Sequence, residues 1–339
     1  MFDWLDPYWF WIAGTVKAVI IAVGVMSVVP GLVWLERRLI GRFQVRLGPN
    51  RVGPLGLGQL IADSIKLLFK ESIVQSYADR FLFHLAPAIV VFTSIVTFSV
   101  IPFGPVYEFE GVPVGLWGAN PDLGLLVFLA MSSMGVYGIV IAGFSSNNKY
   151  SLIGGLRSSA QMISYELTLG LSALSVVVMS GTLNLVEIVE QQGTLPGWNI
   201  WTQPLTFILF FVAGVAETNR APFDLPEAEQ ELVAGFFTEY SGMKFSMFFM
   251  GEYINMITMS ALLTVLFLGG WHAPAEFLEI PVFWFALKVF LILCVFIWLR
   301  ATFPRIRYDR LMTFGWKYLL PLALVNMLAY GTLRVLTLV

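Results

Sequence analysis

The chain has 339 residues, of which 58% are hydrophobic and only 12% are charged, and its net charge is −2. A soluble domain usually carries about twice that charged fraction, so the composition excludes an ordinary soluble protein and predicts one that crosses a membrane several times. A single cysteine excludes an intrachain disulfide and a cysteine-ligated cluster, and two histidines are too few for most haem or zinc sites.

Segments of about 20 apolar residues are long enough to cross a bilayer. The sequence predicts eight such spans, and the fifth is the weakest because it is short and ends on Glu217. The predicted spans are 12–35, 81–101, 122–144, 159–181, 202–219, 244–268, 282–302 and 314–336. No signal peptide is predicted before them. The chain is therefore predicted to be an all-α, polytopic membrane protein, with residues 1–339 forming one membrane domain.

Lysine and arginine are concentrated in alternate loops. The segments after spans one, three, five and seven hold basic residues, whereas loops 102–121, 182–201 and 269–281 hold none. Because basic loops stay on the cytoplasmic side, both termini are predicted to face the other side of the membrane.

The first cytoplasmic segment, residues 36–80, combines a basic turn with an amphipathic helix. Gly-Pro pairs at 48–49 and 53–54 mark turns. In residues 57–72, LGQLIADSIKLLFKES, the apolar side chains fall near one helical stripe. This helix is too short and polar to span the bilayer, so we expect it to lie in the membrane interface. A basic loop with a surface helix would explain the charges equally well, but not the rigidity of the turn.

The loop between spans five and six, residues 217–243, is polar in a chain that is otherwise apolar. Pro222 and Pro226 prevent a helix at its start, since proline lacks an N–H and clashes with the preceding turn. The acids of the loop are Glu217, Asp224, Glu227, Glu229, Glu231 and Glu239. A solvated acidic loop is the alternative to a functional one, but this loop emerges directly from an apolar span.

Three acids lie within predicted spans at a similar depth. Glu166 and Glu252 each lie about two turns from the cytoplasmic end of their span, or about 10–12 Å deep, and Glu217 reaches this level from span five. Ionisable groups inside a membrane are costly, so this acid tier (Glu166, Glu217 and Glu252) is a candidate for proton transfer. Tyr137 in the third span falls at the same depth.

Other ionisable groups and motifs carry less information. Lys17 and Lys288 lie about two turns from the opposite face, and their long stems are expected to snorkel outward. The sequence has no P-loop, no GxGxxG opening a helix, no CxxC and no HExxH. We therefore expect the chain to bind no nucleotide, metal or haem, so that electrons for any redox reaction come from a partner.

Three long motifs resemble one known family. ETNRAPFDLPEAEQELVAGFFTEYSGMKF (217–245) is similar to the loop between spans five and six of the H subunit of bacterial NADH-quinone oxidoreductase, the family of mitochondrial complex I subunit 1. RLGPNRVGPLGLGQLIADSIKLLFKE (46–71) resembles its first cytoplasmic loop, and SNNKYSLIGGLRSSAQMISYEL (146–167) resembles its connection between spans three and four. The resemblance covers essentially the whole chain.

This resemblance implies a membrane subunit of proton-pumping complex I in a bacterial inner membrane. The family's cytoplasmic loops form the floor of a quinone chamber that two hydrophilic subunits roof, and small membrane subunits lie alongside. The substrate would be ubiquinone or menaquinone, entering from the lipid past spans one and six and the interfacial helix. FMN and iron–sulfur clusters would belong only to partner subunits, and no nucleic acid partner is expected.

The resemblance also implies roles for individual residues. The expected quinone-binding residues are Arg37, Arg38, Ala62, Asp63, Arg220 and Phe223. The expected proton-coupling residues are Glu217, Asp224, Glu227, Glu229, Glu231, Glu252 and Glu166, with Tyr137 added from its depth. No catalytic residue and no metal ligand is expected in this chain. Family members often carry a further glutamate in the third span, where this chain offers only Ser132, Ser133 and Tyr137 to support a water chain.

Two alternatives remain open. A homologous subunit of a membrane-bound hydrogenase or of a ferredoxin-linked quinone reductase would share the acidic loop, and only the electron-input subunits would distinguish it. A free-standing ion transporter would have to function when purified alone and would be expected to show internal repeats, of which none is visible.

Overall fold

The computed structural model describes residues 6–109, 112–193, 195–224, 233–274 and 280–338. Within these residues, seven helices are long and apolar enough to cross a membrane. They are α1 (Asp6–Phe43), α3 (Arg80–Ser99), α4 (Gly124–Ser145), α5 (Lys149–Ser180), α10 (Gly242–Phe267), α11 (Pro281–Thr302) and a last helix made of α12 (Tyr308–Phe314), the π-helix η5 (Gly315–Leu319) and α13 (Leu320–Leu338).

Shorter elements connect these helices. They are η1 (Pro54–Gly56), α2 (Gly58–Phe69), β1 (Val106–Phe109), β2 (Val112–Gly115), α6 (Leu185–Gln192), η2 (Leu195–Gly197), α7 (Asn199–Thr202), α8 (Pro204–Glu217) and η3 (Gly235–Phe237). The amphipathic helix is present as predicted, and α2 has no buried residue. The strands β1 and β2 pair antiparallel in a hairpin that the sequence did not predict.

Seven of the eight predicted spans are thus long helices, and the fifth is a short one. Helix α8 has 14 residues, or about 21 Å, which is less than the bilayer's hydrocarbon thickness of about 30 Å. Several other boundaries also differ from the prediction. Helix α1 continues to Phe43, and α5 begins at Lys149, where the Asn148 side chain caps it by accepting from Tyr150 N–H. Both helices continue through polar residues beyond the predicted spans. The prediction was too short because hydropathy marks where the chain crosses the membrane and not where a helix ends.

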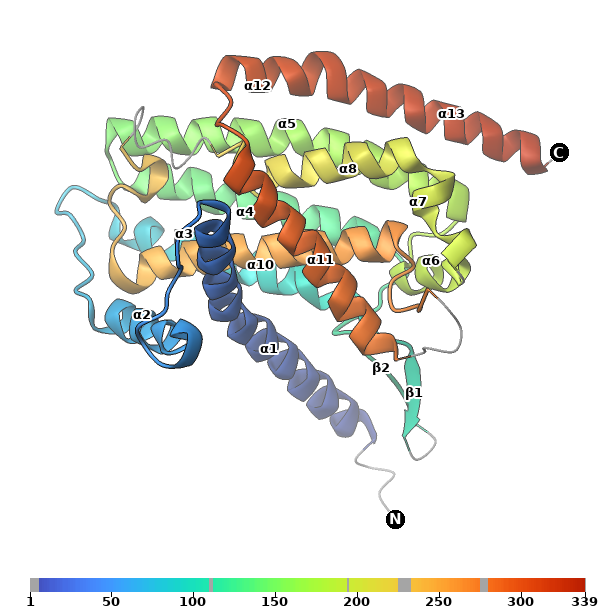
Figure 1. Ribbon diagram of the computed structural model, residues 1–339, viewed down its shortest axis with the longest axis horizontal. Coiled ribbons are helices and arrows are strands. Elements are labelled where there is room, and N and C mark those ends of the chain that lie inside the picture. Colours follow the sequence, from blue (N-terminus) through green and yellow to red (C-terminus); the bar gives the residue numbers. More distant parts are fainter. Residues whose placement is uncertain (1–5, 110–111, 194, 225–232, 275–279, 339) are drawn as a thin grey trace.

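Helix α10 occupies the middle of the bundle, as Figure 1 shows, and 78% of its apolar window is buried. Helix α3 packs against both α10 and α4, α4 packs against α5, and α5 packs against α8. In Figure 1, α1 and α11 run obliquely to α10, while α13 lies along the outer side of α5.

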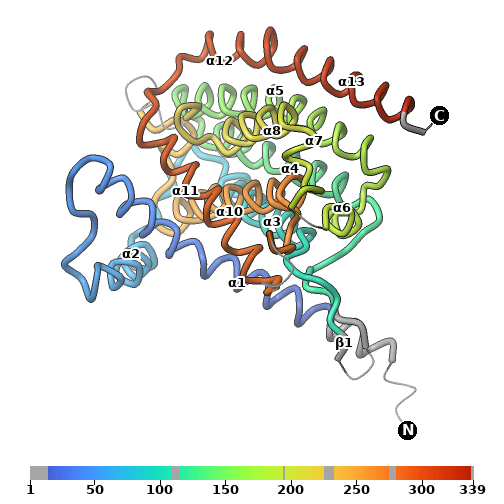
Figure 2. The backbone as a smooth tube through the Cα atoms, turned by 45° about the vertical axis from the view of Figure 1, so that its right-hand side comes forward, coloured from blue at the N-terminus to red at the C-terminus, as the bar shows by residue number. Residues whose placement is uncertain are grey.

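The bundle has two ends of different character, visible in Figures 1 and 2. The end at which α8 ends and α10 begins is called the acid end, and it also carries α2 and α12. The opposite end carries α6, α7 and the β-hairpin. The first described turn of α1 and the last of α13 both lie toward the opposite end.

Glycine contacts set the spacing of the helices that carry the acids. A Cβ on Gly138 of α4 would lie 2.5 Å from Val90 Cγ2 of α3, and a Cβ on Gly251 of α10 would lie 2.5 Å from Val90 Cγ1. Real Cβ atoms do not approach so closely, so both positions require glycine. Small residues let membrane helices approach one another in this way. Gly138 and Gly251 thus let α4 and α10 both pack closely against Val90 of α3, and Gly251 directly precedes Glu252 on α10.

Candidate functional site

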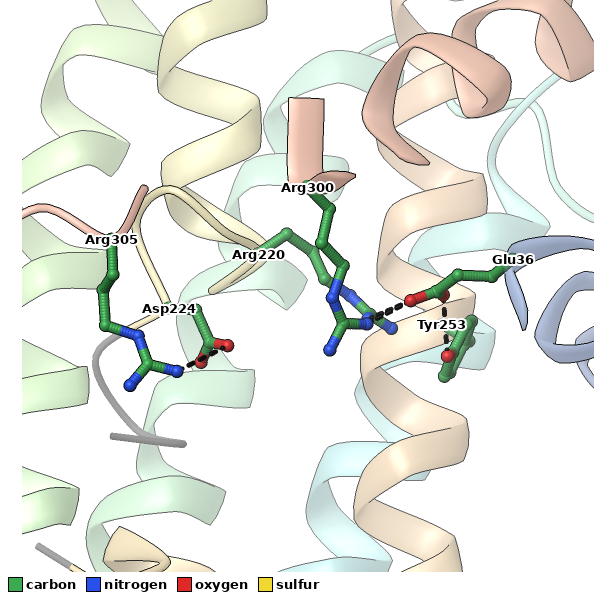
Figure 3. Close-up of polar contacts among 6 residues, drawn as sticks. All are labelled: Glu36, Arg220, Asp224, Tyr253, Arg300 and Arg305. Carbon is green, nitrogen blue, oxygen red and sulfur yellow. Dashed lines mark hydrogen bonds and ion pairs between the residues drawn. The ribbon is translucent and has the colours of Figure 1, made fainter. Parts of the chain in front are cut away.

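A buried carboxylate on α1 links four elements at the acid end (Figure 3). Glu36 continues the buried stripe of Val29 and Leu32 and is itself 4% exposed. Its Oε2 accepts a hydrogen bond from the Tyr253 hydroxyl of α10 at 2.8 Å. Its Oε1 pairs with Arg220 Nη1 at 3.5 Å and with Arg300 of α11. We call these four residues, Glu36, Arg220, Tyr253 and Arg300, the Glu36 cluster.

Arg220 is the most enclosed charge of the Glu36 cluster, with 5% of its surface exposed. Its guanidinium lies 4.2 Å from the centre of the Tyr253 ring, a cation–π contact. Burial alone would lower the pKa of Arg220, but the charges of Glu36, Tyr253 and Glu252 raise it, so the guanidinium stays charged. Its Nε and Nη2 have no hydrogen-bond partner among the described residues. The Glu36 cluster therefore contains buried N–H donors of Arg220 that no described group accepts.

The loop after α8 is fixed by several contacts. Gln161 Nε2 of α5 donates to the carbonyls of Ala216 at 2.7 Å and Phe223 at 2.8 Å. Asp224 pairs with Arg305 at 3.4 Å, which joins this loop to the segment after α11 (Figure 3). The Phe223 ring is buried and packs against Tyr165, with ring centroids 5.8 Å apart.

The far end of the acidic loop is fixed through Glu239, which accepts hydrogen bonds from Asn148 at 2.6 Å and from Gln75. Three of the predicted proton-coupling residues, Glu227, Glu229 and Glu231, lie outside the described residues.

Two of the three acids of the tier contact hydroxyl groups on α4. Ser132 donates to Glu217 Oε1, and Ser133 donates to Glu166 Oε1. The charge of Glu166 also acts on Glu217. The two neighbouring serines of α4 thus connect α5 to α8 through hydrogen bonds.

Glu217 and Glu252 line one small cavity at the acid end. Its volume is about 20 Å³, and its polar lining comes from Glu217, Thr218, Asn219, Glu252 and Asn255. A cavity of this size, with several polar partners, is large enough for about one water molecule. The structure therefore brings together all three acids that the sequence placed at one depth.

The helix α2 is tied to the end of α1 by polar contacts. Arg37 pairs with Asp63 of α2 at 2.6 Å, and Gln59 donates to the same carboxylate at 2.8 Å. Partial burial raises the pKa of Asp63, but these hydrogen bonds and the charge of Arg37 outweigh it and hold the pKa below its usual range. Arg38 donates to the Leu55 carbonyl at 2.8 Å. Ala62 is exposed on α2 beside Asp63.

The structure corrects one sequence-based expectation and leaves another as a prediction. Tyr137 is 63% exposed on the surface of α4, and its expected role in proton coupling stays a prediction. Lys288 does not snorkel, because it is 6% exposed and donates to backbone carbonyls. Lys17 lies with its Nζ 5.7 Å from the centre of the Trp117 ring.

Sequence reasoning missed Glu36, Arg300 and Arg305 as site residues. Glu36 falls in the predicted loop because the predicted first span ends at residue 35. Buried positions 25, 29, 32 and 36 share one face of a helix, and this period is the signal that could have found it. Arg300 and Arg305 give no signal beyond their positive charge. Within the described ranges, no group of three His, Cys, Asp or Glu residues could hold a metal ion.

Comparison with known proteins identifies the family. The family model of NADH dehydrogenase matches residues 16–331. The H subunit of NADH-quinone oxidoreductase from Protochlamydia amoebophila is 55% identical over 304 residues, covering 89% of this chain and 92% of that protein. An H subunit of the same enzyme from Geobacter sulfurreducens is 52% identical, covering 96% of each chain.

A third relative is similar over most of its length. NADH-quinone oxidoreductase subunit 8 from Thermus thermophilus is 51% identical over 321 residues, covering 95% of this chain and 86% of that protein. These matches confirm the resemblance drawn from the three sequence motifs. The chain therefore belongs to the NADH dehydrogenase family, the family of the H subunit of NADH-quinone oxidoreductase.

Proposed function

We propose that this chain forms the floor and entry portal of the quinone chamber of complex I and couples quinone reduction to proton translocation. The family places it among the membrane subunits of that enzyme. The substrate would be a membrane quinone, either ubiquinone or menaquinone. FMN and iron–sulfur clusters would be held by partner subunits, two of which would roof the chamber above the acid end.

The observation that carries the coupling role is the connection among the acids of the tier. Glu166 and Glu217 each accept a hydrogen bond from a serine of α4, and Glu217 shares a water-sized cavity with Glu252. Carboxylates joined by hydroxyls and a water can exchange protons along hydrogen bonds. The arrangement thus offers a route for protons through the bundle, inside the apolar protein.

The Glu36 cluster would connect the chamber to the acid tier. Quinone reduction takes up two electrons and two protons, so the charge in the chamber changes during each turnover. Arg220 pairs with Glu36 and also feels the charge of Glu252. In the low dielectric of the protein interior, such charges act over longer distances than in water. A change at the chamber would therefore alter the proton affinity of the tier.

The entry portal would lie between α1 and α2. The Arg37–Asp63 pair holds the polar side of α2 against α1. The apolar side chains Ile61, Ile65 and Leu68 are exposed on α2. An isoprenoid quinone tail needs an apolar path of this kind, while its head group needs polar partners at the end of the path.

The proton route would continue toward a small membrane subunit packed on α4. Tyr137 lies one helical turn beyond Ser133, and its side chain is exposed in this chain. A neighbouring subunit would cover it in the complex. The complex would lie in the bacterial inner membrane, with the acid end in the cytoplasm and both termini on the periplasmic side.

The test of coupling replaces single acids of the tier. Glu217→Gln and Glu252→Gln keep the size of each side chain but remove its exchangeable charge. Each should lower NADH-driven quinone reduction and proton pumping by about tenfold or more, because loss of a positioned proton-transfer group typically costs 10²–10⁴-fold. Glu190→Gln, an exposed acid on α6, is the matched control. Wild-type pumping by a fully assembled Glu217→Gln complex would refute the role of the tier.

The identity of the complex has its own test. Purification of the chain from its native membrane in mild detergent, followed by mass spectrometry, should recover flavin- and iron–sulfur-bearing NADH dehydrogenase subunits. Recovery of hydrogenase or ferredoxin-linked subunits would instead select the related complex, and a stable chain without partners would indicate a transporter.

A further inference from the structure

An open apolar groove lies between α5 and α13, toward the opposite end of the bundle. Its volume is about 580 Å³, and ligand sites typically have volumes of about 300–1,000 Å³. Val178 lines it from α5, and a stripe of α13 from Met327 to Leu336 lines it from the other side. Figure 1 shows α13 along the outer side of α5, and only 17% of the apolar window of this last helix is buried. We call this hollow the α13 groove.

A glycine lies in the middle of the stripe that lines the α13 groove. A Cβ on Gly331 would meet no other described segment within 4 Å, unlike the glycines that set the packing of α4 and α10. Glycine inside a helix is unfavourable relative to alanine, and small residues in membrane helices usually allow close packing. Because no described segment packs on Gly331, an occupant from outside the described chain can approach α13 there.

A basic residue lies at one end of the α13 groove. Arg334 directly precedes Val335 of the lining stripe. A Cβ on Gly181 would lie 4.0 Å from Arg334 Nη2, and Gly181 is the left-handed C-cap of α5. A cation is stabilised at this negative end of a helix. Arginine has five N–H donors, so the same guanidinium can also bind an anion.

The α13 groove has about the length of one leaflet of the membrane. From Met327 to Leu336 the helix rises about 14 Å, whereas the hydrocarbon core of a bilayer is about 30 Å thick. Gly181 is the last residue of the predicted fourth span, so Arg334 lies where hydrocarbon meets the head groups. A transmembrane helix of a partner would need a groove that continues through both leaflets. The short groove instead fits an acyl chain, and its basic end fits a phosphate, which arginine binds through paired hydrogen bonds.

We propose that the α13 groove binds an anionic phospholipid, with one acyl chain between α5 and α13 and the phosphate on Arg334. Basic residues beside membrane helices recognise anionic head groups. The head group carries no amine, because the ammonium of a zwitterionic lipid would compete with Arg334 for the phosphate. The proposal requires that the bundle crosses the membrane, but it does not require the proton-coupling role of the acid tier.

The loops at this end give the proposal separate support. Loops 102–121, 182–201 and 269–281 hold no lysine or arginine. Lysine and arginine are usually concentrated on the cytoplasmic side of a membrane protein. Arg334 departs from that preference, and a bound phosphate gives a basic residue at this end a partner of opposite charge.

The experiment uses phosphatidylglycerol with a photoreactive diazirine in one acyl chain. The assembled complex is reconstituted in phosphatidylcholine vesicles that contain this probe, and labelled peptides are mapped by mass spectrometry after illumination. Labelling should occur on α13 between Met327 and Leu336 and on the end of α5. Arg334→Gln should lower it about tenfold, because hydrogen bonds between charged groups typically contribute about that much to an affinity. Arg334→Lys keeps the charge and should lose less.

Two further variants and a second probe separate the groove from its charge. Gly331→Leu fills the α13 groove without removing the charge, and it should also lower the labelling. Lys317→Gln is the matched control, because it removes an exposed basic residue from the other end of the same helix and should leave the labelling unchanged. A phosphatidylethanolamine probe with the same acyl chain should label the groove weakly in the wild type.

Three outcomes would overturn the proposal. They are equal labelling of the wild type by the two probes, unchanged labelling in Arg334→Gln, and no labelling of the α13 groove in the wild-type complex, which would show that another protein segment fills it. If Arg334→Gln does not assemble, Gly331→Leu and the comparison of the two probes on the wild type decide the question. Failure of the proposed coupling role would show differently, as wild-type pumping in the Glu217→Gln complex.

Discussion

The two ends of the bundle contain buried charges but stabilise them in different ways. At the acid end, Glu36 and Arg220 are stabilised by other side chains. Glu217 and Glu252 line a water-sized cavity there. At the opposite end, Lys288 is held by three backbone carbonyls. A buried charge must have partners in either case.

The choice of partners determines whether the charge can change. Side-chain hydroxyls, carboxylates and water can rotate and exchange protons, so the acid end can respond to chemistry nearby. Backbone carbonyls accept hydrogen bonds but do not carry protons, so the three partners of Lys288 cannot exchange a proton with it. The comparison teaches that the partners of a buried charge determine whether it can exchange protons with its surroundings.

The largest expected effect comes from removal of the central carboxylate at the acid end. Glu36→Gln leaves Arg220 and Arg300 close together without the carboxylate that both contact. Breaking a buried ion pair in this way typically costs about 3–5 kcal/mol. We expect a clear fall in the thermal midpoint and yield of the complex. Glu71→Gln, an exposed acid before α3, is the control, and equal stability of the two variants would contradict the central role of Glu36.

Replacement of a buried polar side chain at the opposite end should affect stability and not catalysis. The Gln192 side chain donates to the Val265 carbonyl at 2.8 Å and accepts from Gly269 N–H at 2.9 Å. Gln192→Leu should lower the free energy of unfolding by about 2 kcal/mol, because it leaves buried backbone groups unpaired. Quinone reduction per assembled complex should not change. The neighbouring exposed residue offers the control Gln191→Leu, and a loss of activity without a loss of stability would show that the two ends are not separate.

A smaller effect is expected when the hydroxyls of α4 are removed one at a time. Ser132→Ala deprives Glu217 of its donor, and Ser133→Ala does the same to Glu166. Each should reduce coupled turnover about three- to tenfold, which corresponds to about 1 kcal/mol in the barrier. Ser175→Ala, whose hydroxyl donates only to its own helix at Leu171, provides the comparison. Unchanged turnover in both α4 variants would remove these serines from the proton route.

The smallest effect concerns pH and the position of α2. The folded pKa of Asp63 is lowered, so its stabilising contacts are complete above the unfolded value of about 3.9 and are lost as the pH falls through the lowered folded value. A spin label at Ser64 should therefore keep constant mobility from pH 8 to about 4 and become more mobile below that. Asp63→Asn should show the mobile state throughout, and mobility that changes near pH 6 would point to a different group.

The sequence predicted the features that depend on hydropathy and residue counting. The spans and the amphipathic helix follow from the length and period of apolar segments. The shared depth of Glu166, Glu217 and Glu252 follows from their distance along each helix, and the serines and cavity between them agree with it.

The features that the sequence did not predict depend on rotation and on contacts between distant segments. The apolar side chains of α4 do not gather on one face of the helix, so no polar face indicated that Tyr137 would be exposed. The partners of Lys288 are backbone carbonyls of a turn between α10 and α11, and backbone atoms leave no residue-specific signal. Glu36 escapes prediction because the end of an apolar stretch is not the end of the helix.

The short α8 has a consequence for the synthesis of the chain. Its 14 residues are fewer than the translocation machinery needs to recognise a membrane-spanning segment. Helix α8 begins directly after Gln203, which is fully buried. It packs on α5, which precedes it in the chain and is therefore synthesised first. Helix α10, which follows it, also contacts α8. Retention of α8 in the membrane therefore depends on neighbours made before and after it, so that insertion and folding of this part of the chain occur together.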